Sequence, residues 1–304
     1  MKFLYDEQVA SQPQAVQAVL ERAAPPRLDL SRPLLFAGLG TSLHACRVAA
    51  AWAGFPAQAL DAHELALRLP VPRDAQVVVV THGGKGPFAA AVLAKARAAG
   101  ARTFAVVGEH APALAADVIV RTCPAERAET HTVSYLTALA VLGRMSGREL
   151  REVPRLLRET LAAEPPLREA RELAQCDRGL VTGFGLDAIT AAEAALKLKE
   201  ATFKWAEGMP VEEALHGPHA ALRGGMGAIL IPPAGDDAGR TSALRELCEK
   251  RGVRAVQLPV LACSEELRPL IAIVPLQRLT AEIARLCGGD PDHGINVPAS
   301  AKAR

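Results

Sequence analysis

The feature that most constrains the fold is a repeated alternation of short apolar runs with alanine-rich segments, joined by glycine turns. The run PLLFAGLG (33–40) leads into SLHACRVAAAWAG, and AQVVVV (75–80) leads through THGGKG into PFAAAVLAKARAAGA. Short apolar runs that end at turn residues are typical of buried strands, and longer alanine-rich segments are typical of helices. Strands that alternate with helices predict a parallel sheet covered by helices on both faces.

The same pattern occurs twice along the chain. In the first half, further strands are expected at 57–60, 103–108 and 116–123. In the second half, GLVTGFGLDA (179–188) repeats LLFAGLGTSL, with Gly183 and Gly185 where Gly38 and Gly40 stood, and strands are expected at 227–233, 255–260 and 270–274. We therefore expect a duplicated α/β domain. Its expected modules are a helical segment (1–24), a first domain (25–146), a helical connector (147–175) and a second domain with the tail (176–304).

Composition and charge exclude several classes of function. The 304 residues include 35 basic and 33 acidic side chains, a net charge of +2, with no basic block, so neither a nucleic-acid partner nor a membrane surface is expected. The first residues do not read as a signal peptide, and no apolar run reaches the roughly 18 residues of a membrane span. Six scattered cysteines without a CxxC pair indicate reduced thiols in a cytoplasmic protein.

The first glycine turn, GLGTS (38–42), is suited to an anion. Backbone N–H groups converge where a glycine turn enters a helix, and the helix dipole favours negative charge. Gly40 allows close approach, while Thr41 and Ser42 supply hydroxyls; the alternative is that one of them only caps the helix. Leu43 occupies the third glycine position of GxGxxG, which disfavours a dinucleotide cofactor.

The stretch AAEAALKLKEATFKWAEGMPVEEALHGPHAAL (191–222) is the most specific in the chain. Four charged residues in it, spaced by four, three and four, fall on one stripe of a helix: Glu193, Lys197, Glu200 and Lys204. A solvated stripe of ion pairs is the plain alternative, but the intervening alanines and leucines indicate a packed helix. Carboxylates and lysines in a partly dry site are candidates for acid–base chemistry. His216 and His219 have no third ligand at a suitable spacing, so no metal is expected.

Together these residues resemble the sugar isomerase (SIS) domain family. GLGTSLHAC is similar to the first phosphate loop of SIS domains, and residues 193–222 are similar to the signature of the isomerase half of glucosamine-6-phosphate synthase and its stand-alone relatives. PLQRLTAEIARLCGGDPD (275–292) is similar to the closing helix of that family. The resemblance extends from about residue 25 to the tail. It implies two tandem SIS domains, each a flavodoxin-like three-layer α/β/α structure.

The resemblance also implies roles for particular residues. Glu200 would move a proton between C1 and C2 of an open-chain sugar phosphate, and His216 would assist ring opening, reaching the site of the neighbouring subunit in a homodimer. Glu193 and Lys197 would support or orient the site. No cofactor is implied. Because no glutaminase segment precedes the repeat and Met1 is not a cysteine nucleophile, we do not expect glutamine-dependent amide transfer.

Three segments depart from the family pattern. The second phosphate loop, usually Ser-x-Ser-Gly-Glu followed by Thr or Ser, here has lost hydroxyls and reversed the charge of the glutamate; it consists of Thr81, His82, Gly83, Gly84, Lys85 and Gly86. In the next segment Thr132 and Ser134 survive, but Val133 stands at a lysine position. In the tail Ala299 aligns with a lysine, so Lys302 is the candidate substitute.

These observations leave two classes of function. The retained Glu200 and His216 favour an enzyme that acts on a phosphorylated sugar or amino sugar, by aldose–ketose isomerisation or by deamination or deglycation. The altered second loop and tail favour a non-catalytic sugar-phosphate binding or regulatory protein. Glycine amides with Lys85 can still bind a phosphate or another acidic group, because a nest of N–H groups needs no side chains.

Overall fold

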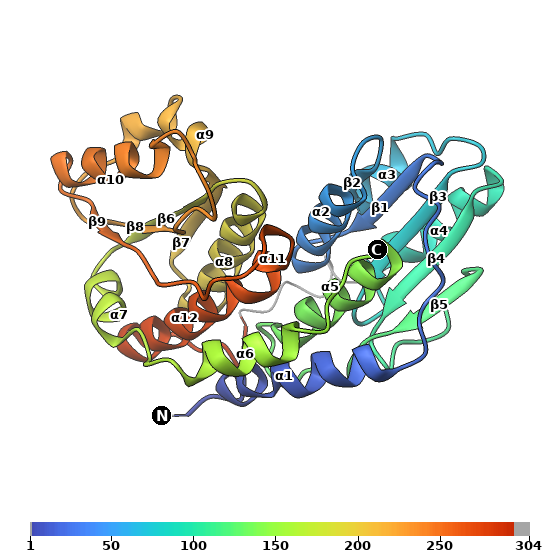
Figure 1. Ribbon diagram of the computed structural model, residues 1–304, viewed down its shortest axis with the longest axis horizontal. Helices are drawn as coiled ribbons and strands as arrows, with labels where there is room; N and C mark the ends of the chain where they lie inside the picture. Colours follow the sequence, from blue (N-terminus) through green and yellow to red (C-terminus); the bar gives the residue numbers. More distant parts are fainter. Residues whose placement is uncertain (1, 295–304) are drawn as a thin grey trace. The chain divides into compact units, whose positions relative to one another are not determined.

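The computed structural model describes residues 2–294, and these form two compact units. The N-terminal unit comprises Gln14–Glu126 and Val133–Arg151, and the C-terminal unit comprises 2–13, Arg127–Thr132 and Glu152–Gly294. Each unit contains one parallel β-sheet with helices packed against it (Figure 1). The predicted α/β class with parallel sheets is confirmed, while the module boundaries at residues 24, 146 and 175 stay a proposal.

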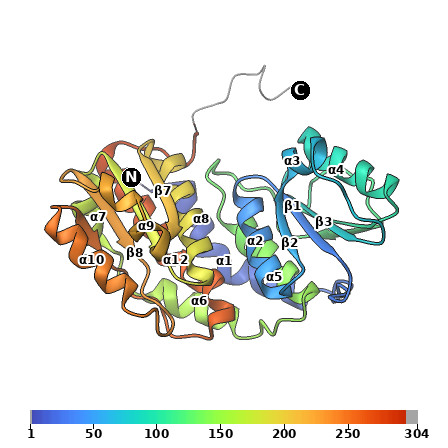
Figure 2. The ribbon, with the colours of Figure 1, turned by 90° about the horizontal axis from the view of Figure 1, so that it is seen from above.

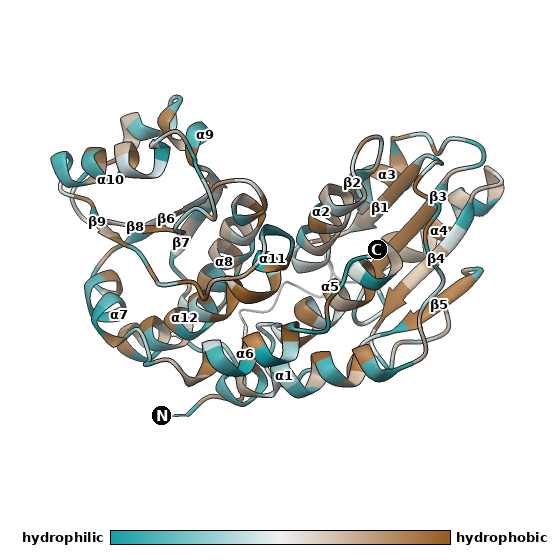
Figure 3. Ribbon diagram, viewed as in Figure 1, coloured by the Kyte–Doolittle hydropathy of each residue, from teal (hydrophilic) through white to brown (hydrophobic). Residues whose placement is uncertain are grey.

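The sheet of the N-terminal unit has five parallel strands in the order β2-β1-β3-β4-β5. The strands are β1 (Leu34–Gly38), β2 (Gln58–Asp61), β3 (Gln76–Thr81), β4 (Arg102–Val107) and β5 (Val118–Arg121). All five had been predicted. Strands β1, β3 and β4 are buried along almost their whole length, which is why they read as continuous apolar runs (Figure 3).

Helices cover both faces of this sheet (Figure 2). One face carries α3 (Ala62–Leu67) and α4 (Pro87–Ala98), whose apolar side chains form a core with alternate residues of the central strands. The other carries α2 (Thr41–Ala53) and α5 (Val133–Met145). Helix α1 (Leu4–Glu21) contributes its first turns to the C-terminal unit and the rest to the N-terminal unit.

The sheet of the C-terminal unit has four parallel strands in the order β7-β6-β8-β9. The strands are β6 (Arg178–Gly183), β7 (Trp205–Pro210), β8 (Met226–Leu230) and β9 (Arg254–Val256). The helices are α6 (Val153–Ala162), α7 (Leu167–Ala174), α8 (Leu186–Thr202), α9 (Val211–Leu215), α10 (Arg240–Lys250), α11 (Arg268–Ile271) and α12 (Ile273–Cys287), with short 3₁₀ turns at Pro218–Ala221 and Glu265–Leu267. No helix within residues 2–294 has the length and apolar character needed to cross a membrane.

Two expectations from the sequence are wrong in this unit, and one strand was not predicted. Residues 270–274 are helical rather than a strand, because a fully buried helix segment gives the same apolar run as a buried strand. Strand β7 was not foreseen, since this edge strand carries the exposed Trp205 and Glu207. Lys204 is not on the helical stripe, because α8 ends at Thr202 and Phe203 takes a left-handed conformation, with φ of 58°.

The two glycine turns have the same backbone conformation, as the repeat predicted. Gly40 has φ 53° and ψ −128°, and Gly185 has φ 59° and ψ −129°, values that L-residues rarely adopt. A Cβ at Gly38 would lie 2.7 Å from the backbone of Ser42, and one at Gly183 would lie 2.3 Å from the carbonyl oxygen of Asp187. In both units the glycines therefore let a helix begin directly against the end of a strand.

Candidate functional site

Helix α8 brings three of the predicted catalytic residues together. The ammonium of Lys197 lies 2.6 Å from Glu200 Oε2 and 3.6 Å from Glu193 Oε1. The spacing of four and three residues along the helix produces this grouping, because such residues are neighbours on one face. The alternative of a solvent-exposed stripe of ion pairs is wrong for Glu193 and Lys197, because their side chains are only 0% and 1% exposed.

The group has one accessible member. The Glu200 side chain is 37% exposed, whereas the lysine beside it is sealed from solvent. A buried ammonium is stable only when it is paired and hydrogen-bonded, and here Glu193 supplies a buried counter-charge. The arrangement therefore presents a carboxylate to a ligand with a fixed positive charge directly behind it, which suits proton transfer coupled to oxyanion stabilisation.

His216 lies in the same unit but on a different element. It is the residue that ends α9, it is exposed, and its backbone N–H donates to the carbonyl of Glu213. Gly217, with φ of 124°, turns the chain into the 3₁₀ segment that contains His219. Among residues 2–294, no three His, Cys, Asp or Glu side chains converge as a metal site would require. The imidazole of His216 is thus available to a ligand.

In the N-terminal unit, Gly40, Thr41 and Ser42 begin helix α2. Gly40 is the N-cap residue of α2, so neither Thr41 nor Ser42 occupies the N-cap position that the alternative gave to one of them. The N–H of Ser42 donates to the carbonyl of Leu39 and holds the turn. Both hydroxyl residues are half-buried at the carboxyl end of β1, the edge where parallel sheets usually bind ligands.

The loop Thr81–Gly86 follows β3 in the same unit. The hydroxyl of Thr81 accepts a hydrogen bond from the Gly84 N–H at 3.3 Å, so this side chain stabilises the turn. Gly84 has φ of 64° and packs against Ala111 and Pro112, while Gly83, Lys85 and Gly86 are exposed. Helix α4 then begins at Pro87, which has no N–H to offer an anion. The exposed ammonium of Lys85 is the positive charge that this loop presents.

His82 of the same loop packs on the neighbouring strand end. Its carbonyl accepts from the N–H of Gly108 at 3.0 Å, and a Cβ at Gly108 would lie 2.7 Å from the imidazole ring. His82 is therefore part of the framework that joins the ends of β3 and β4, a role that its position in the loop sequence did not suggest.

Sequence reasoning missed Glu126 at the start of α5. Its carboxylate accepts from the N–H groups of Val133, at 2.9 Å, and Ser134, at 2.8 Å. The amino end of this helix, which favours an anion, therefore already holds an internal carboxylate. Ser134 is buried beside it, and Thr132, also buried, belongs to the C-terminal unit. Glu126 lies seven residues before Val133, which is farther than the spacing of local capping motifs, so the sequence alone did not indicate this contact.

A second ion pair lies at the glycine turn that begins α8. Asp187 Oδ2 accepts from Nε of Arg268 at 2.6 Å, and both side chains are buried. The Arg268 guanidinium also donates to the carbonyl of Pro232. Burial raises the pKa of Asp187 to about 6, although Arg268 acts in the opposite direction. This turn thus differs from its counterpart in the N-terminal unit, because Asp187 stands where Ser42 stands there. Lys302 lies outside the described residues.

The chain is similar in sequence to curated glutamine–fructose-6-phosphate aminotransferases. No family model matches it. Over 319 aligned residues it is 28% identical to a glutamine–fructose-6-phosphate aminotransferase (isomerizing) of Thermococcus kodakarensis, covering 88% of this chain and 51% of that protein. The chain therefore spans about half the length of the curated relatives it matches.

Solved structures show the same fold. The C-terminal domain of glucosamine-fructose-6-phosphate aminotransferase from Francisella tularensis superposes with a TM-score of 0.85 at 19% identity, covering 96% of this chain and 99% of that one. A glucosamine-6-phosphate deaminase from Thermotoga maritima superposes with a TM-score of 0.82 at 18% identity, covering 97% and 98%.

Proposed function

This chain is a relative of the sugar isomerase (SIS) proteins, and from that premise we propose that it acts on a phosphorylated sugar or amino sugar by moving a proton between C1 and C2. The observation that carries the proposal is the α8 group, in which the accessible carboxylate of Glu200 lies 2.6 Å from the buried ammonium of Lys197. Aldose–ketose exchange passes through an enediol, so it needs one carboxylate that removes a proton from one carbon and returns a proton to the other, and the proton on the carboxylate can exchange with solvent in between.

We assign a role to each member of the α8 group and to His216. Glu200 is the proton-transfer base, and Lys197 orients it and stabilises the negative charge that develops on the substrate oxygen. Glu193 is the buried counter-ion of Lys197. His216, exposed at the end of α9, assists ring opening.

The phosphate is proposed to bind in the N-terminal unit. Thr41 and Ser42 at the start of α2 supply hydroxyls and the positive end of the helix dipole, and Lys85 supplies a cation. The chain is further proposed to pair with a second copy, with His216 reaching the partner's site. The curated relatives carry the word "isomerizing" in their names, which supports the C1/C2 chemistry. The fold neighbour named a deaminase makes loss of an amino group the second reaction to test.

A non-catalytic sugar-phosphate sensor is the second candidate, and the loop Thr81–Gly86 is the observation that favours it. The one hydroxyl left in this loop holds the turn, and Pro87 follows at the first position of α4. Glu126 occupies the amino end of α5. A phosphate would thus meet fewer donors here than the family pattern offers, which suits weak binding better than rapid turnover.

One experiment separates these functions. The protein is incubated in deuterated water with fructose 6-phosphate, glucose 6-phosphate and glucosamine 6-phosphate, and NMR follows deuterium at C1 and C2 together with ammonia release. Exchange without ammonia identifies an isomerase, and exchange with ammonia identifies a deaminase. A thermal shift with one of these ligands but no exchange identifies a sensor, since a ligand that binds only the folded state raises Tm. No response to any of them contradicts both candidates.

A further inference from the structure

A cavity of about 260 Å³ lies in the C-terminal unit, between the first turns of α1, the end of α6 and helix α12. This volume is just below the roughly 300–1,000 Å³ typical of small-molecule sites, so it suits a compact ligand. The lining comes from one stripe of α1, one stripe of α12, the last turn of α6 and the loop that follows it. No residue of α8 or of a strand takes part, so the cavity is separate from the proposed reaction.

Three of the four charged side chains in the lining bind one another. The Arg285 guanidinium donates to Asp6 Oδ2 at 2.8 Å and to both carboxylate oxygens of Glu282. It also lies over the ring of Phe3, 5.3 Å from the ring centroid. Two carboxylates therefore share one cation, and this cluster keeps a net negative charge that repels a second negative charge on a ligand.

Arg278 is the fourth charged side chain, and no carboxylate of residues 2–294 pairs with it. Its Nη1 donates to the carbonyl of Thr160 at 3.3 Å, although a guanidinium has five N–H donors. The residue is half-buried, and this burial lowers the pKa of the guanidinium, while Glu282 and Glu164 act in the opposite direction. A cation that is partly removed from water gains from a counter-ion, so Arg278 is the group best placed to hold an anion.

Apolar side chains form much of the remaining lining. Val9 and Ala10 come from α1, Leu161 from the end of α6, and Ala281 from α12. Ala281 lies three residues after Arg278, so the apolar wall and the guanidinium share one face of α12. The two alanines leave room that longer side chains would fill. A ligand that matches this lining has an anionic head and a small apolar body.

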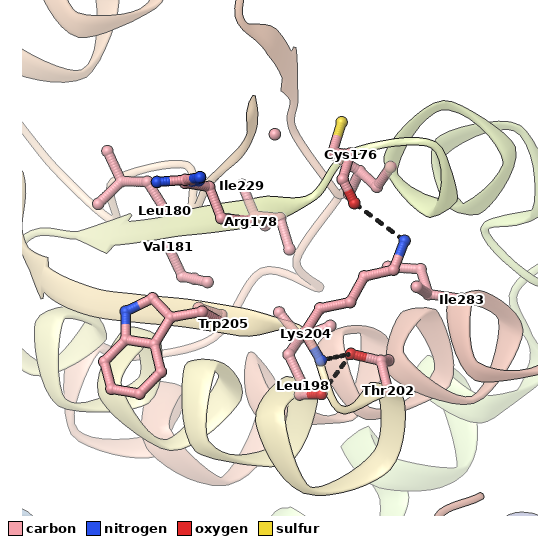
Figure 4. Close-up of a pocket in the computed structure, with 14 residues that line it drawn as sticks. Cys176, Arg178, Leu180, Val181, Leu198, Thr202, Lys204, Trp205, Ile229 and Ile283 are labelled. Atoms are coloured by element: carbon pink, nitrogen blue, oxygen red, sulfur yellow. Dashed lines mark hydrogen bonds between the residues drawn. The ribbon is translucent and has the colours of Figure 1, made fainter. Parts of the chain in front are cut away.

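Another hollow, at the amino-terminal halves of β6, β7 and β8, does not offer such a site (Figure 4). Its volume is about 40 Å³, which has room for only a few water molecules. Its cations already have partners, because Lys204 donates to the carbonyls of Ala174 and Cys176 and Arg178 pairs with Asp177. The cavity at Arg278 differs in both volume and available charge.

We propose that the cavity at Arg278 binds a compact organic monocarboxylate, with the carboxylate on Arg278 and the apolar body against Val9 and Ala281. The planar fork of a guanidinium matches a carboxylate through two parallel hydrogen bonds. A doubly charged anion would be repelled by the Arg285 cluster, and an uncharged molecule would leave Arg278 without a counter-ion. The proposal goes beyond the proposed function and does not depend on it.

Isovalerate is the probe that tests it, with isoamyl alcohol as its uncharged analogue and methylsuccinate as a doubly charged analogue. Thermal unfolding at constant ionic strength and saturation-transfer NMR of the probe are the readouts. We expect isovalerate to raise Tm in a saturable way and to receive saturation from the protein, because a ligand of the folded state stabilises it. The alcohol and the dianion should bind more weakly.

Arg278→Gln is the decisive variant, since it removes the charge and keeps a polar side chain. It should weaken isovalerate binding at least tenfold, because hydrogen bonds to charged groups are the strong ones. Ala10→Leu should also weaken binding, since leucine suits this exposed helix position and would fill part of the cavity. Arg251→Gln, at the exposed end of α10 in the same unit, is the matched control and should bind isovalerate as the wild type does.

Several results would overturn the proposal. One is the lack of a saturable isovalerate effect in the wild type, and another is equal binding by the wild type and Arg278→Gln. Tighter binding of the alcohol or the dianion, or an equal loss of binding in Arg251→Gln, would do the same. If Arg278→Gln does not fold, Ala10→Leu decides, because unchanged isovalerate binding there would place the ligand outside this cavity.

Discussion

The ammonium of Lys197, whose side chain is 1% exposed, lies 2.6 Å from a carboxylate oxygen of Glu200, whose side chain is 37% exposed. A buried ammonium therefore lies beside a carboxylate that solvent can reach. Glu193, completely buried, lies on the other side of the ammonium at 3.6 Å.

Removing the charge of Lys197 should destabilise the protein. Lys197→Met leaves the buried Glu193 without its counter-ion, which typically costs about 3–5 kcal/mol in the free energy of unfolding. Urea unfolding measures this loss, with Lys250→Met at the exposed end of α10 as the matched control. A double variant, Lys197→Met with Glu193→Gln, should regain part of the stability. Equal stability of Lys197→Met and the control would mean that the buried pair has no such role.

The phosphate placement predicts weaker binding for two variants of the N-terminal unit. Ser42→Ala removes a hydroxyl at the start of α2, and Lys85→Ala removes the exposed cation of the following loop. Each should lower the affinity for a sugar phosphate several-fold, and the effect of Lys85→Ala should shrink at high salt, because exposed charges are screened. Calorimetric titration at low and high ionic strength measures both. Unchanged affinity in both variants would show that the phosphate binds elsewhere.

Sharing of the site between two copies predicts complementation. Glu200→Gln and His216→Ala should each be inactive alone, yet a mixture of the two purified proteins should recover activity after subunit exchange. In a mixed dimer one site would contain both wild-type residues. Activity assays before and after mixing, with light scattering to establish the oligomeric state, provide the measurement. If the scattering shows dimers and mixing restores nothing, His216 acts within its own chain or not at all.

The Asp187–Arg268 pair predicts a specific pH dependence of stability. The pKa of Asp187 is raised from 3.8 to about 6, mainly by burial and also by Glu265, so the folded state holds this proton more tightly than the unfolded state does. The resulting stabilisation is on the order of 3 kcal/mol and is complete below about pH 4. It is lost as pH rises to about 6 and is absent above that pH. The free energy of unfolding of the wild type minus that of Asp187→Asn should therefore fall as pH rises from about 4 to about 6. Glu249→Gln, on the exposed side of α10, should show no such change.

Much of the fold could be predicted because short stretches of sequence, such as a buried strand followed by a glycine turn, identify its elements. Buried strands followed by glycine turns identified both sheets, and the matching turns at Gly40 and Gly185 confirm the repeat. Edge strand β7 could not be predicted in this way, because half of its residues face solvent. Helices α11 and α12 were misread at their junction because complete burial removes helical periodicity.

The α8 group was equally predictable, since three- and four-residue spacing along one helix determines which side chains meet. The partners that come from distant parts of the chain could not be foreseen. Glu126 reaches α5 across a loop, and Arg268 reaches Asp187 from 81 residues away. Lys204 was assigned to the stripe because its spacing was right, but the helix ends two residues before it.

Exchange of the C2 proton of a sugar phosphate in deuterated water, compared between the wild type, Glu200→Gln and Glu249→Gln, tests the central claim most directly. Removing a positioned general base typically costs 10²–10⁴-fold in rate. We predict that Glu200→Gln lowers the exchange rate by that factor while it still binds the sugar phosphate, and that Glu249→Gln matches the wild type. Undiminished exchange in Glu200→Gln would contradict the assignment of Glu200 as the base.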